Sequence, residues 1–384
     1  MMTRTTPLLL VLFTIILVVA GCGAKPAPPT STLDSPEYHY RAGLKYLETD
    51  QVDAALKAFE RAISLNPDSP LGHIGKGLAL GKKGDFKNAF DSMEEGKDLD
   101  KKGVEGNIGM IRLLSMQRGE DWLKNSEKEY KEASEKDPGN GRLHYYMGMA
   151  YKLALDFDRA GEMFKKTVEL NKDMVGEANA EWALVQKIQR SAPGSVIGKQ
   201  IALIDKIDRA DVAALFDQEM DLEKLYTKRG TKVIDTTFKA PTETTTRFSP
   251  EKVEKMEPAT DIADHWLKPS IDLVLKLRVR GLEAGPDHKF EPDKQITKAE
   301  FALMLEDVLI RVSGDEKLAT KYLGATSPFP DVRNDHYAFS AIMTATSRGY
   351  LEADKATGEF RPGDPVSGAD ALLTIREFKN QLKF

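Results

Sequence analysis

The sequence predicts a mainly α-helical protein, with an N-terminal α-solenoid followed by small helical modules of the helix-loop-helix type. Three observations lead to this fold class. Small and aromatic residues recur with a period of 34 residues in the first half of the chain. A different pattern of residues occurs twice near the C-terminus. A content of 41% hydrophobic and 30% charged residues is typical of soluble helical domains, and 384 residues suffice for two or three of them.

The first residues have the pattern of a secretory signal peptide. Arg4 precedes an apolar run from Leu8 to Ala20, which is shorter than the about 20 residues that a membrane-spanning helix needs. A basic start, a short apolar run and small residues at its end are typical of a cleaved signal. We therefore expect segment 1–21 to be removed and exclude it from the fold.

The residues at the end of this segment resemble the lipobox of bacterial lipoproteins. The motif is Val19-Ala20-Gly21-Cys22, and Cys22 is the only cysteine of the sequence. A free thiol would be an oxidation liability in an exported protein, so this placement favours lipidation over a buried structural thiol. The resemblance implies a diacylglycerol and acyl lipid on Cys22 as the only attached group, and two or more chains anchor a protein stably.

Two further features follow from the residues after this cysteine. In diderm bacteria an Asp at the next position often signals retention in the inner membrane, so Gly23 favours the outer membrane. In a monoderm cell the outer face of the cytoplasmic membrane is the corresponding place. Segment 22–35 is rich in Pro, Thr and Ser and is expected to be a flexible tether.

Residues 36–190 are predicted to form helical repeats with a capping helix. The first copy begins at Pro36, and further copies begin at Pro70 and Gly141. A degenerate copy begins at Asn107 after a slip of three residues. The pattern resembles the tetratricopeptide (TPR) repeat, which implies pairs of antiparallel helices stacked into a solenoid. In the copy that starts at Pro36, positions 8, 11, 20, 24, 27 and 32 are Gly43, Tyr46, Ala55, Phe59, Ala62 and Pro67.

The TPR resemblance also implies a concave groove that binds a protein or peptide partner. A solenoid needs a cap for its last face, and Val175 to Gln189 is suited to that role. His39, His73 and His144 all stand at position 4 of a repeat. Equivalent residues of successive repeats lie a repeat apart, whereas metal ligands must converge, so we favour packing and predict no metal site.

Segments 259–313 and 327–384 share a second pattern. Each has an Asp near its start, a His-aromatic pair, an apolar helix that ends at Gly281 or Gly349, and Phe-x-Pro before a β-branched residue. This frame resembles the S-layer homology (SLH) module. The pairs are His265-Trp266 and His336-Tyr337, and the Phe-x-Pro elements are Phe290 to Pro292 before Ile296 and Phe360 to Pro362 before Val366.

A third copy of the end of this frame stands earlier, at Ile207 to Asp211. It lacks an obvious His-aromatic helix before it, so we expect a partial module at 195–230 and a linker at 231–258. SLH modules commonly act in threes, and the resemblance implies a possible pseudo-trimer with these motifs near its centre.

Each of the three motifs places an N-cap residue three positions before an acidic residue, at the start of an apolar helix. Such a pair predicts a capping box or an Asp-based version of one. Helix initiation therefore explains three of the four motif positions without any ligand. The capping pairs are Asp208 with Asp211, Thr297 with Glu300, and Ser367 with Asp370.

The fourth position of the motif is the candidate binding site, because a basic residue in the first helical turn works against the helix dipole. Beside free backbone N–H groups it creates an anion site. In SLH proteins an Arg here is associated with acidic cell-wall polymer. This sequence has Arg209, Lys298 and Gly368, and Lys lacks the bidentate geometry of Arg. We predict polymer binding by Arg209 and Lys298, with a purely structural SLH fold as the alternative.

Trp266 and Tyr337 are further candidates for polymer binding, because they could present a face to a sugar. An aromatic residue at the start of such a helix more commonly belongs to the core, which is the interpretation that we favour.

Several classes of function are not expected. A net charge of −5 argues against a nucleic-acid partner. The sequence contains no GxxxxGK[ST], HExxH, CxxC or GxSxG motif, so we expect no catalytic residues and no enzyme.

The leading hypothesis is an envelope lipoprotein whose TPR groove binds a protein and whose SLH modules bind peptidoglycan or an associated acidic polymer. The first alternative is a TPR lipoprotein that assists assembly of a secretion or pilus machine, with a merely structural SLH region. A wall-modifying enzyme is the third.

Overall fold

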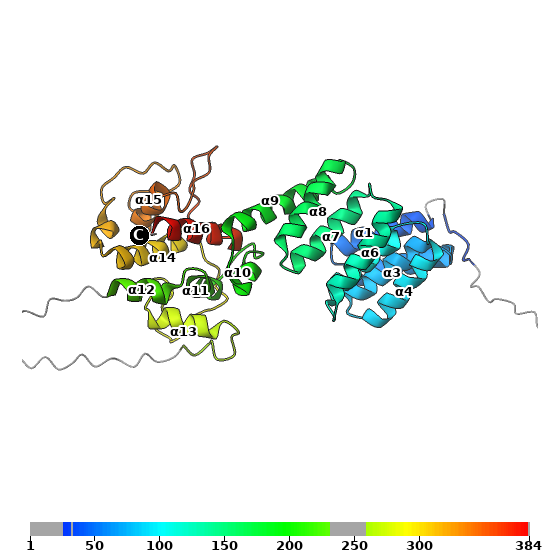
Figure 1. Ribbon diagram of the computed structural model, residues 1–384, viewed down its shortest axis with the longest axis horizontal. Coiled ribbons are helices and arrows are strands. Elements are labelled where there is room, and N and C mark those ends of the chain that lie inside the picture. Colours follow the sequence, from blue (N-terminus) through cyan, green and yellow to red (C-terminus); the bar gives the residue numbers. More distant parts are fainter. Residues whose placement is uncertain (1–25, 32–33, 231–258, 383–384) are drawn as a thin grey trace, which may run out of the picture. The chain divides into compact units, whose positions relative to one another are not determined.

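The computed structural model describes residues 26–31, 34–230 and 259–382. The expected signal peptide 1–21, Cys22 and the linker 231–258 lie outside the described residues. The described chain is helical and has only isolated β-bridges in place of strands, which confirms the mainly α fold class. It forms two compact units, one that ends at Gly139 and one that begins at Asn140 (Figure 1).

The first unit consists of three antiparallel helix pairs. The helices of each pair pack on each other, and the first helices of successive pairs, α1, α3 and α5, also pack in order. Ser35 and Ser69 cap α1 and α3 by accepting a hydrogen bond from a backbone N–H, and each cap is followed by proline at the first helical position. The helices are α1 (Pro36–Glu48), α2 (Val52–Leu65), α3 (Pro70–Lys82), α4 (Phe86–Leu99), α5 (Glu105–Gln117) and α6 (Trp122–Lys136).

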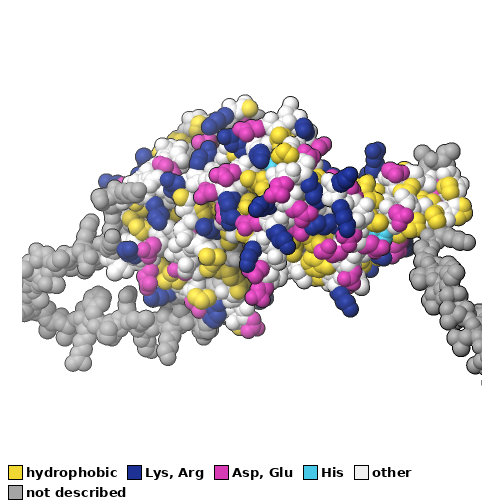
Figure 2. Space-filling model, turned by 45° about the vertical axis from the view of Figure 1, so that its right-hand side comes forward, with side chains coloured by type: hydrophobic (Ala, Val, Ile, Leu, Met, Phe, Trp, Pro, Cys, Tyr) yellow, Lys and Arg dark blue, Asp and Glu magenta, His cyan; other side chains and the backbone are white. Residues whose placement is uncertain are grey.

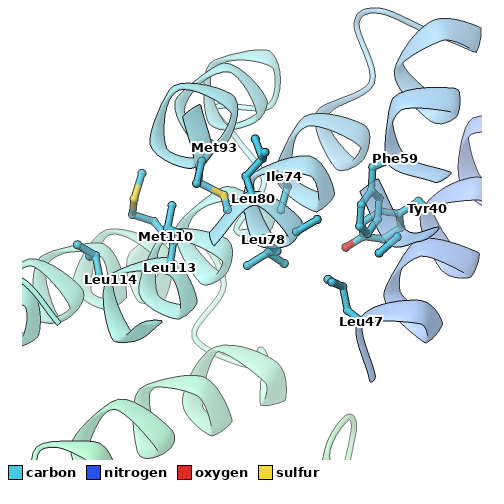
Figure 3. Packing of buried hydrophobic residues seen from close by; sticks show 13 residues of the cluster. Tyr40, Leu47, Phe59, Ile74, Leu78, Leu80, Met93, Met110, Leu113 and Leu114 are labelled. Carbon is cyan, nitrogen blue, oxygen red and sulfur yellow. The ribbon is translucent and has the colours of Figure 1, made fainter. Parts of the chain in front are cut away.

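Glycines allow a buried aromatic ring to lie between two repeats. Phe59 of α2 is fully buried, and its ring centre is 6.0 Å from that of Tyr40 (Figure 3). A Cβ on Gly43 would lie 2.5 Å from this ring, and a Cβ on Gly75 would lie 2.2 Å from it. The same ring therefore contacts a glycine of its own repeat and one of the next repeat, and the contact with Gly43 explains why the 34-residue pattern pairs a small residue at position 8 with a large one at position 24.

The degenerate copy keeps the period in its first helix, which corrects its expected start at Asn107. Helix α5 begins at Glu105, and a Cβ on Gly109 would lie 2.6 Å from the sulfur of Met93. Gly109 thus has the place that Gly75 has one period earlier. The three additional residues follow Gly109: one lengthens the end of α5, one lies in the turn that joins α5 to α6, and one is in α6 itself.

Part of the segment expected to be a flexible tether contacts the first repeat. The backbone N–H of Ala27 donates to the Ser64 carbonyl at 2.6 Å, and Asp34 accepts hydrogen bonds from Thr30, from His39 at 2.7 Å and from Arg61 Nε at 3.1 Å. The Arg61 guanidinium holds the pKa of the Asp34 carboxyl well below its usual range. The Ala27 hydrogen bond and this charged cluster fasten Ala27, Thr30 and Asp34 to α2.

The second unit begins with another helix pair and continues into the C-terminal modules. Helices α7 and α8 pack on each other, and α9 packs on α8. A Cβ on Gly148 would lie 2.7 Å from the Phe164 ring, so this pair repeats the packing of the first unit. The helices are α7 (Gly141–Leu153), α8 (Phe157–Leu170), α9 (Val175–Ser191), α10 (Val196–Ile201), α11 (Arg209–Gln218), α12 (Leu222–Gly230), α13 (Lys268–Lys276), α14 (Lys298–Ser313), the 3₁₀ helix η1 (Glu316–Thr320), α15 (Phe339–Ser347) and α16 (Gly368–Gln381).

The C-terminal modules form a closed ring of three. Helix α11 packs on α13, α14 packs on α15, and α16 packs on α9 (Figure 1). The helix that follows each motif therefore contacts the first helix of the next module, and the third module returns to α9. The arrangement is the pseudo-trimer that the sequence suggested.

Helix α9 belongs both to the repeats and to the ring. Its left-handed residue Ala192 corresponds to Arg278 after α13 and to Gly349 after α15, with φ of 47°, 50° and 72°. Fully buried Val185, Ile271 and Ile342 each precede that residue by seven positions. The first module, expected to be partial, therefore has a first helix after all, and that helix is α9. Its first helix was overlooked because α9 has no His-aromatic pair, and Arg278 rather than Gly281 is the counterpart of Gly349.

Candidate functional site

The three motifs meet at the centre of the ring through backbone hydrogen bonds. The N–H of Ile207 donates to the Val366 carbonyl at 2.9 Å, that of Val366 donates to Ile296 at 3.2 Å, and that of Ile296 donates to Ile207 at 3.1 Å. All three side chains are buried. This cycle connects each module to both of the others and places the starts of α11, α14 and α16 around one centre.

Capping residues fix the start of each motif helix. Asp208 and Asp211 form a reciprocal capping box at α11, and Thr297 and Glu300 form one at α14. At α16, the Ser367 hydroxyl accepts a hydrogen bond from the backbone N–H of Asp370 at 3.1 Å. The same hydroxyl donates a hydrogen bond to the Asp370 carboxylate at 2.6 Å.

Arg209 fastens the first module to the second. Its Nε donates to the Phe290 carbonyl at 2.7 Å, and its two terminal nitrogens donate to the carbonyls of Gly281 at 2.6 Å and Glu283 at 2.8 Å. The guanidinium carbon lies 4.7 Å from the centre of the Phe290 ring. The guanidinium thus satisfies three main-chain hydrogen-bond acceptors. We did not predict this structural role from the sequence.

Lys298 makes the equivalent contact from the second module to the third. Its Nζ donates to the Phe360 carbonyl at 2.6 Å and to the Glu352 carbonyl at 3.2 Å, and it lies 4.4 Å from the centre of the Phe360 ring. Burial lowers the pKa of this ammonium. Arg209 and Lys298 therefore occupy equivalent places at two of the three module junctions.

Gly368 has no side chain because the third junction has no room for one. A Cβ there would lie 1.7 Å from the Ile201 carbonyl oxygen, and the Gly368 N–H donates to the Ile204 carbonyl at 2.8 Å. The backbone of the first module fills the space that Arg209 and Lys298 use at the other junctions.

The His-aromatic pairs present their aromatic rings to solvent. His265 and His336 accept a hydrogen bond through Nδ1 from the N–H two residues later, at 3.1 and 3.2 Å. Leu267 and Ala338 fill the core, whereas Trp266 and Tyr337 are 62% and 68% exposed. Our preference for a core role of these two aromatic residues was therefore wrong. The histidine accepts its hydrogen bond just before the helix begins, and the residue that follows the aromatic one, Leu267 or Ala338, takes the core position.

The Asp at the start of the second and third modules has a structural role that we did not assign from the sequence. Asp261 accepts hydrogen bonds from the N–H groups of Phe290 and Glu291, at 2.8 and 2.7 Å. Asp331 accepts the same pair of bonds from Phe360 and Arg361, at 2.9 and 2.6 Å. These carboxylates hold the Phe-x-Pro loops in the positions from which their carbonyls receive Arg209 and Lys298.

Comparison with known proteins identifies both kinds of repeat. A family model of the tetratricopeptide repeat matches residues 36–69, and a family model of the S-layer homology domain matches residues 328–372. The chain carries TPR repeats and an SLH domain. Tetratricopeptide repeats suggest protein–protein interaction, and an SLH domain suggests cell-wall binding.

Relatives of the chain include two proteins of Acetivibrio thermocellus. Cell surface glycoprotein 1 is 33% identical over 127 residues, which is 32% of this chain and 5% of that protein. Exoglucanase XynX is 29% identical over 107 residues, which is 28% of this chain and 9% of that protein. The chain therefore spans less than a tenth of the length of either relative.

Among solved structures, the chain is similar to a thermophilic TPR protein of Thermus thermophilus. The two share 20% sequence identity over 50% of this chain and 97% of that one, with a TM-score of 0.36. An SLH domain points to the cell envelope or surface.

The described residues lack two further kinds of feature. No helix among them is both long and apolar enough to cross a membrane. Nor does the described part of the chain bring together three or more His, Cys, Asp or Glu side chains that could hold a metal ion.

Replacing Arg209 by alanine is expected to lower the free energy of unfolding by about 2–3 kcal/mol, because three SLH carbonyls lose a charged donor. Urea unfolding of this variant and of Arg333→Ala measures the effect. Arg333 is exposed and pairs only with Asp335 among the contacts of the described chain. Equal midpoints for the two variants would contradict the fastening role of Arg209.

Asp208→Thr is expected to raise SLH stability above pH 6. Burial, together with repulsion by the neighbouring Asp208 carboxylate, raises the pKa of Asp211 to about 6. The folded state therefore binds more protons than the unfolded state between about pH 4 and pH 6, so stability falls as the pH rises through that interval.

Threonine at position 208 could still cap α11, as Thr297 caps α14, but would bring no second negative charge. If the pKa of Asp211 falls by one unit, the variant gains about 1.4 kcal/mol at pH 8. Urea unfolding at pH 4.5 and pH 8 measures this gain. Parallel pH profiles for wild type and variant would show that the two carboxylates do not repel each other in the fold.

Proposed function

We propose that this chain is an envelope lipoprotein that binds the cell wall through its SLH domain and a protein partner through its TPR repeats. The lipid on Cys22 would fix one end to a membrane, the outer membrane in a diderm cell or the outer face of the cytoplasmic membrane in a monoderm cell. The protein would act as a tether or scaffold without catalytic activity.

The observation that carries this proposal is the exposure of Trp266 and Tyr337 at equivalent places of two modules. Both side chains lie more than three-fifths in solvent, although burial of large aromatic rings stabilises a fold. Their neighbours Leu267 and Ala338 already supply the core contact. An exposed ring beside a fixed helix start is a suitable platform for the apolar face of a sugar.

The basic residues at the junctions support an acidic polymer as the ligand. Arg209 donates hydrogen bonds from three of the five N–H groups of a guanidinium, and Lys298 donates two of its three. Each therefore retains donors for a carboxylate while it fastens two modules together. Their role in polymer binding remains a prediction, and it is compatible with their structural role.

The lipobox supports the lipid anchor, and the docked segment limits its reach. The backbone of Ala27 is hydrogen-bonded to Ser64 of α2, and Ala27 is only five residues after Cys22. Five residues span at most about 17 Å. An acylated Cys22 would thus hold the first TPR repeat close to the membrane surface.

Trp266→Ala combined with Tyr337→Ala is expected to weaken binding to purified cell-wall sacculi at least about tenfold, since two stacking platforms are lost. Co-sedimentation over a series of sacculus concentrations measures the affinity. Leu323→Ala, which removes another exposed apolar side chain, is the control. Unchanged affinity of the double variant, with its fold intact, would exclude these aromatic residues as wall-binding groups.

A further inference from the structure

A cavity of about 750 Å³ lies in the second unit where the shared helix α9 faces the third SLH module. Lys187 and Arg190 of α9 line it, together with Lys298 at the start of α14. Its other walls come from residues 349–352 and Lys355, from Pro365 and Val366, and from one face of α16. The volume lies within the range of about 300–1,000 Å³ that is usual for small-ligand sites.

Four cationic and three acidic side chains line this cavity, in a protein whose net charge is −5. Two of the acids are already paired, because Lys187 lies 2.8 Å from Asp370 and Lys355 lies 3.1 Å from Glu352. Among the described residues, the Arg190 guanidinium has no hydrogen-bond or ion-pair partner. The lining therefore holds a cation that the fold itself does not use.

Lys, Arg, Asp and Glu side chains are interspersed over the face that Figure 2 displays, without a broad basic field. The third junction is also the one whose motif has lost its basic residue, at Gly368. Helix α9, which packs on α16, supplies two cations, and one of them, Lys187, pairs with Asp370 two residues after Gly368.

We propose that Lys187 and Arg190 are binding residues for an acidic saccharide, so that the helix which caps the TPR repeats is also part of the polymer site. This inference rests on the proposed wall binding and assigns it a specific cavity. Arg190 and Lys298 bind a carboxylate of the sugar. Leu351, Val366 and Leu373 contact the apolar face of the ring.

A carboxylate-bearing sugar is the ligand whose chemistry we match to this cavity. A guanidinium with free N–H groups binds a carboxylate in a bidentate manner. Apolar side chains make up part of the same wall, which suits a ligand that has both a charge and an apolar face.

The test is co-sedimentation of the full chain with sacculi that retain their attached polymers. Lys187→Ala combined with Arg190→Ala is expected to raise the apparent Kd at least tenfold. Lys165→Ala combined with Lys166→Ala, on α8 and outside the cavity, removes the same charge and is expected to bind as wild type does. Thermal unfolding of both variants checks the fold, because only exposed contacts are removed.

The possible outcomes separate this inference from the function on which it rests. If wild type itself is not retained by sacculi, the proposed function fails. If wild type is retained and the α9 variant binds equally well, the function stands and the role of Lys187 and Arg190 is refuted. Sacculi whose carboxylates have been converted to neutral amides are expected to lose the α9-dependent binding. Persistence of that binding would identify phosphate as the anion and overturn the carboxylate assignment.

Discussion

Gly368→Ala is expected to lower the free energy of unfolding of the SLH domain by at least about 3 kcal/mol, because the junction has no space for a methyl group. The new Cβ would lie 1.7 Å from the carbonyl oxygen of Ile201 and 2.6 Å from its carbonyl carbon. Both atoms belong to the main chain, so α16 must move away from the first module. The hydrogen bond from Gly368 to Ile204 would be lost with it.

Urea unfolding measures this loss, and Gly363→Ala is a matched control, since a Cβ there would meet no atom within 4 Å. Gly368→Arg sharpens the test. It restores the basic residue that SLH motifs commonly have, yet we expect it to destabilise the ring even more. A stable Gly368→Arg variant that binds more polymer than wild type would show that the third junction can open to admit a side chain.

Ile188→Ala is expected to destabilise the TPR cap and the SLH ring together, by about 2–5 kcal/mol. Ile188 is fully buried in α9, which packs on α8 on one side and on α16 on the other. A cavity beneath it would loosen both contacts, because one helix serves both neighbours. Hydrogen exchange of peptides from α8 and α16 measures the two effects separately.

Gln186→Ala, an exposed change in the same helix, is expected to leave exchange in both helices unaltered. Faster exchange of α8 peptides alone after Ile188→Ala would mean that α9 is only a TPR cap. Faster exchange of α16 peptides alone would mean that it belongs only to the ring.

The sequence was most informative where packing demands a residue type at a fixed interval. Gly43, Gly77 and Gly148 all stand at position 8 of their repeats, because the side chain at position 24, Phe59, Met93 or Phe164, fills the space beside each of them. The SLH frame was equally informative, since Phe290 and Phe360 each precede a buried β-branched residue by the same number of positions in the sequence. Both patterns follow from main-chain geometry that tolerates few substitutions.

The double role of α9 could not be predicted in this way. Val185 and Ile188 have the same spacing in a TPR cap as in an SLH helix, so the apolar pattern fits both. The left-handed conformation after the helix is carried by Ala192, whereas the third module uses Gly349. A glycine at position 192 would have revealed the correspondence.

The roles of the junction residues also depend on contacts that are distant in sequence. Arg209 reaches Gly281, 72 positions later, and Lys298 reaches Phe360, 62 positions later. A motif can indicate a cation at the start of a helix but cannot identify the carbonyls opposite it. For Trp266 and Tyr337 the missing information was that the next residue already fills the core.

Attachment of this protein to two layers of the envelope is tested most directly by fractionation after selective release. Cell envelopes are treated either with mild detergent, which dissolves membranes, or with a muramidase, which digests the wall. We predict that the protein stays with sacculi after detergent and with membranes after digestion. Cys22→Ser should lose only the membrane fraction, whereas complete release of the wild-type protein by either treatment alone would contradict attachment at two points.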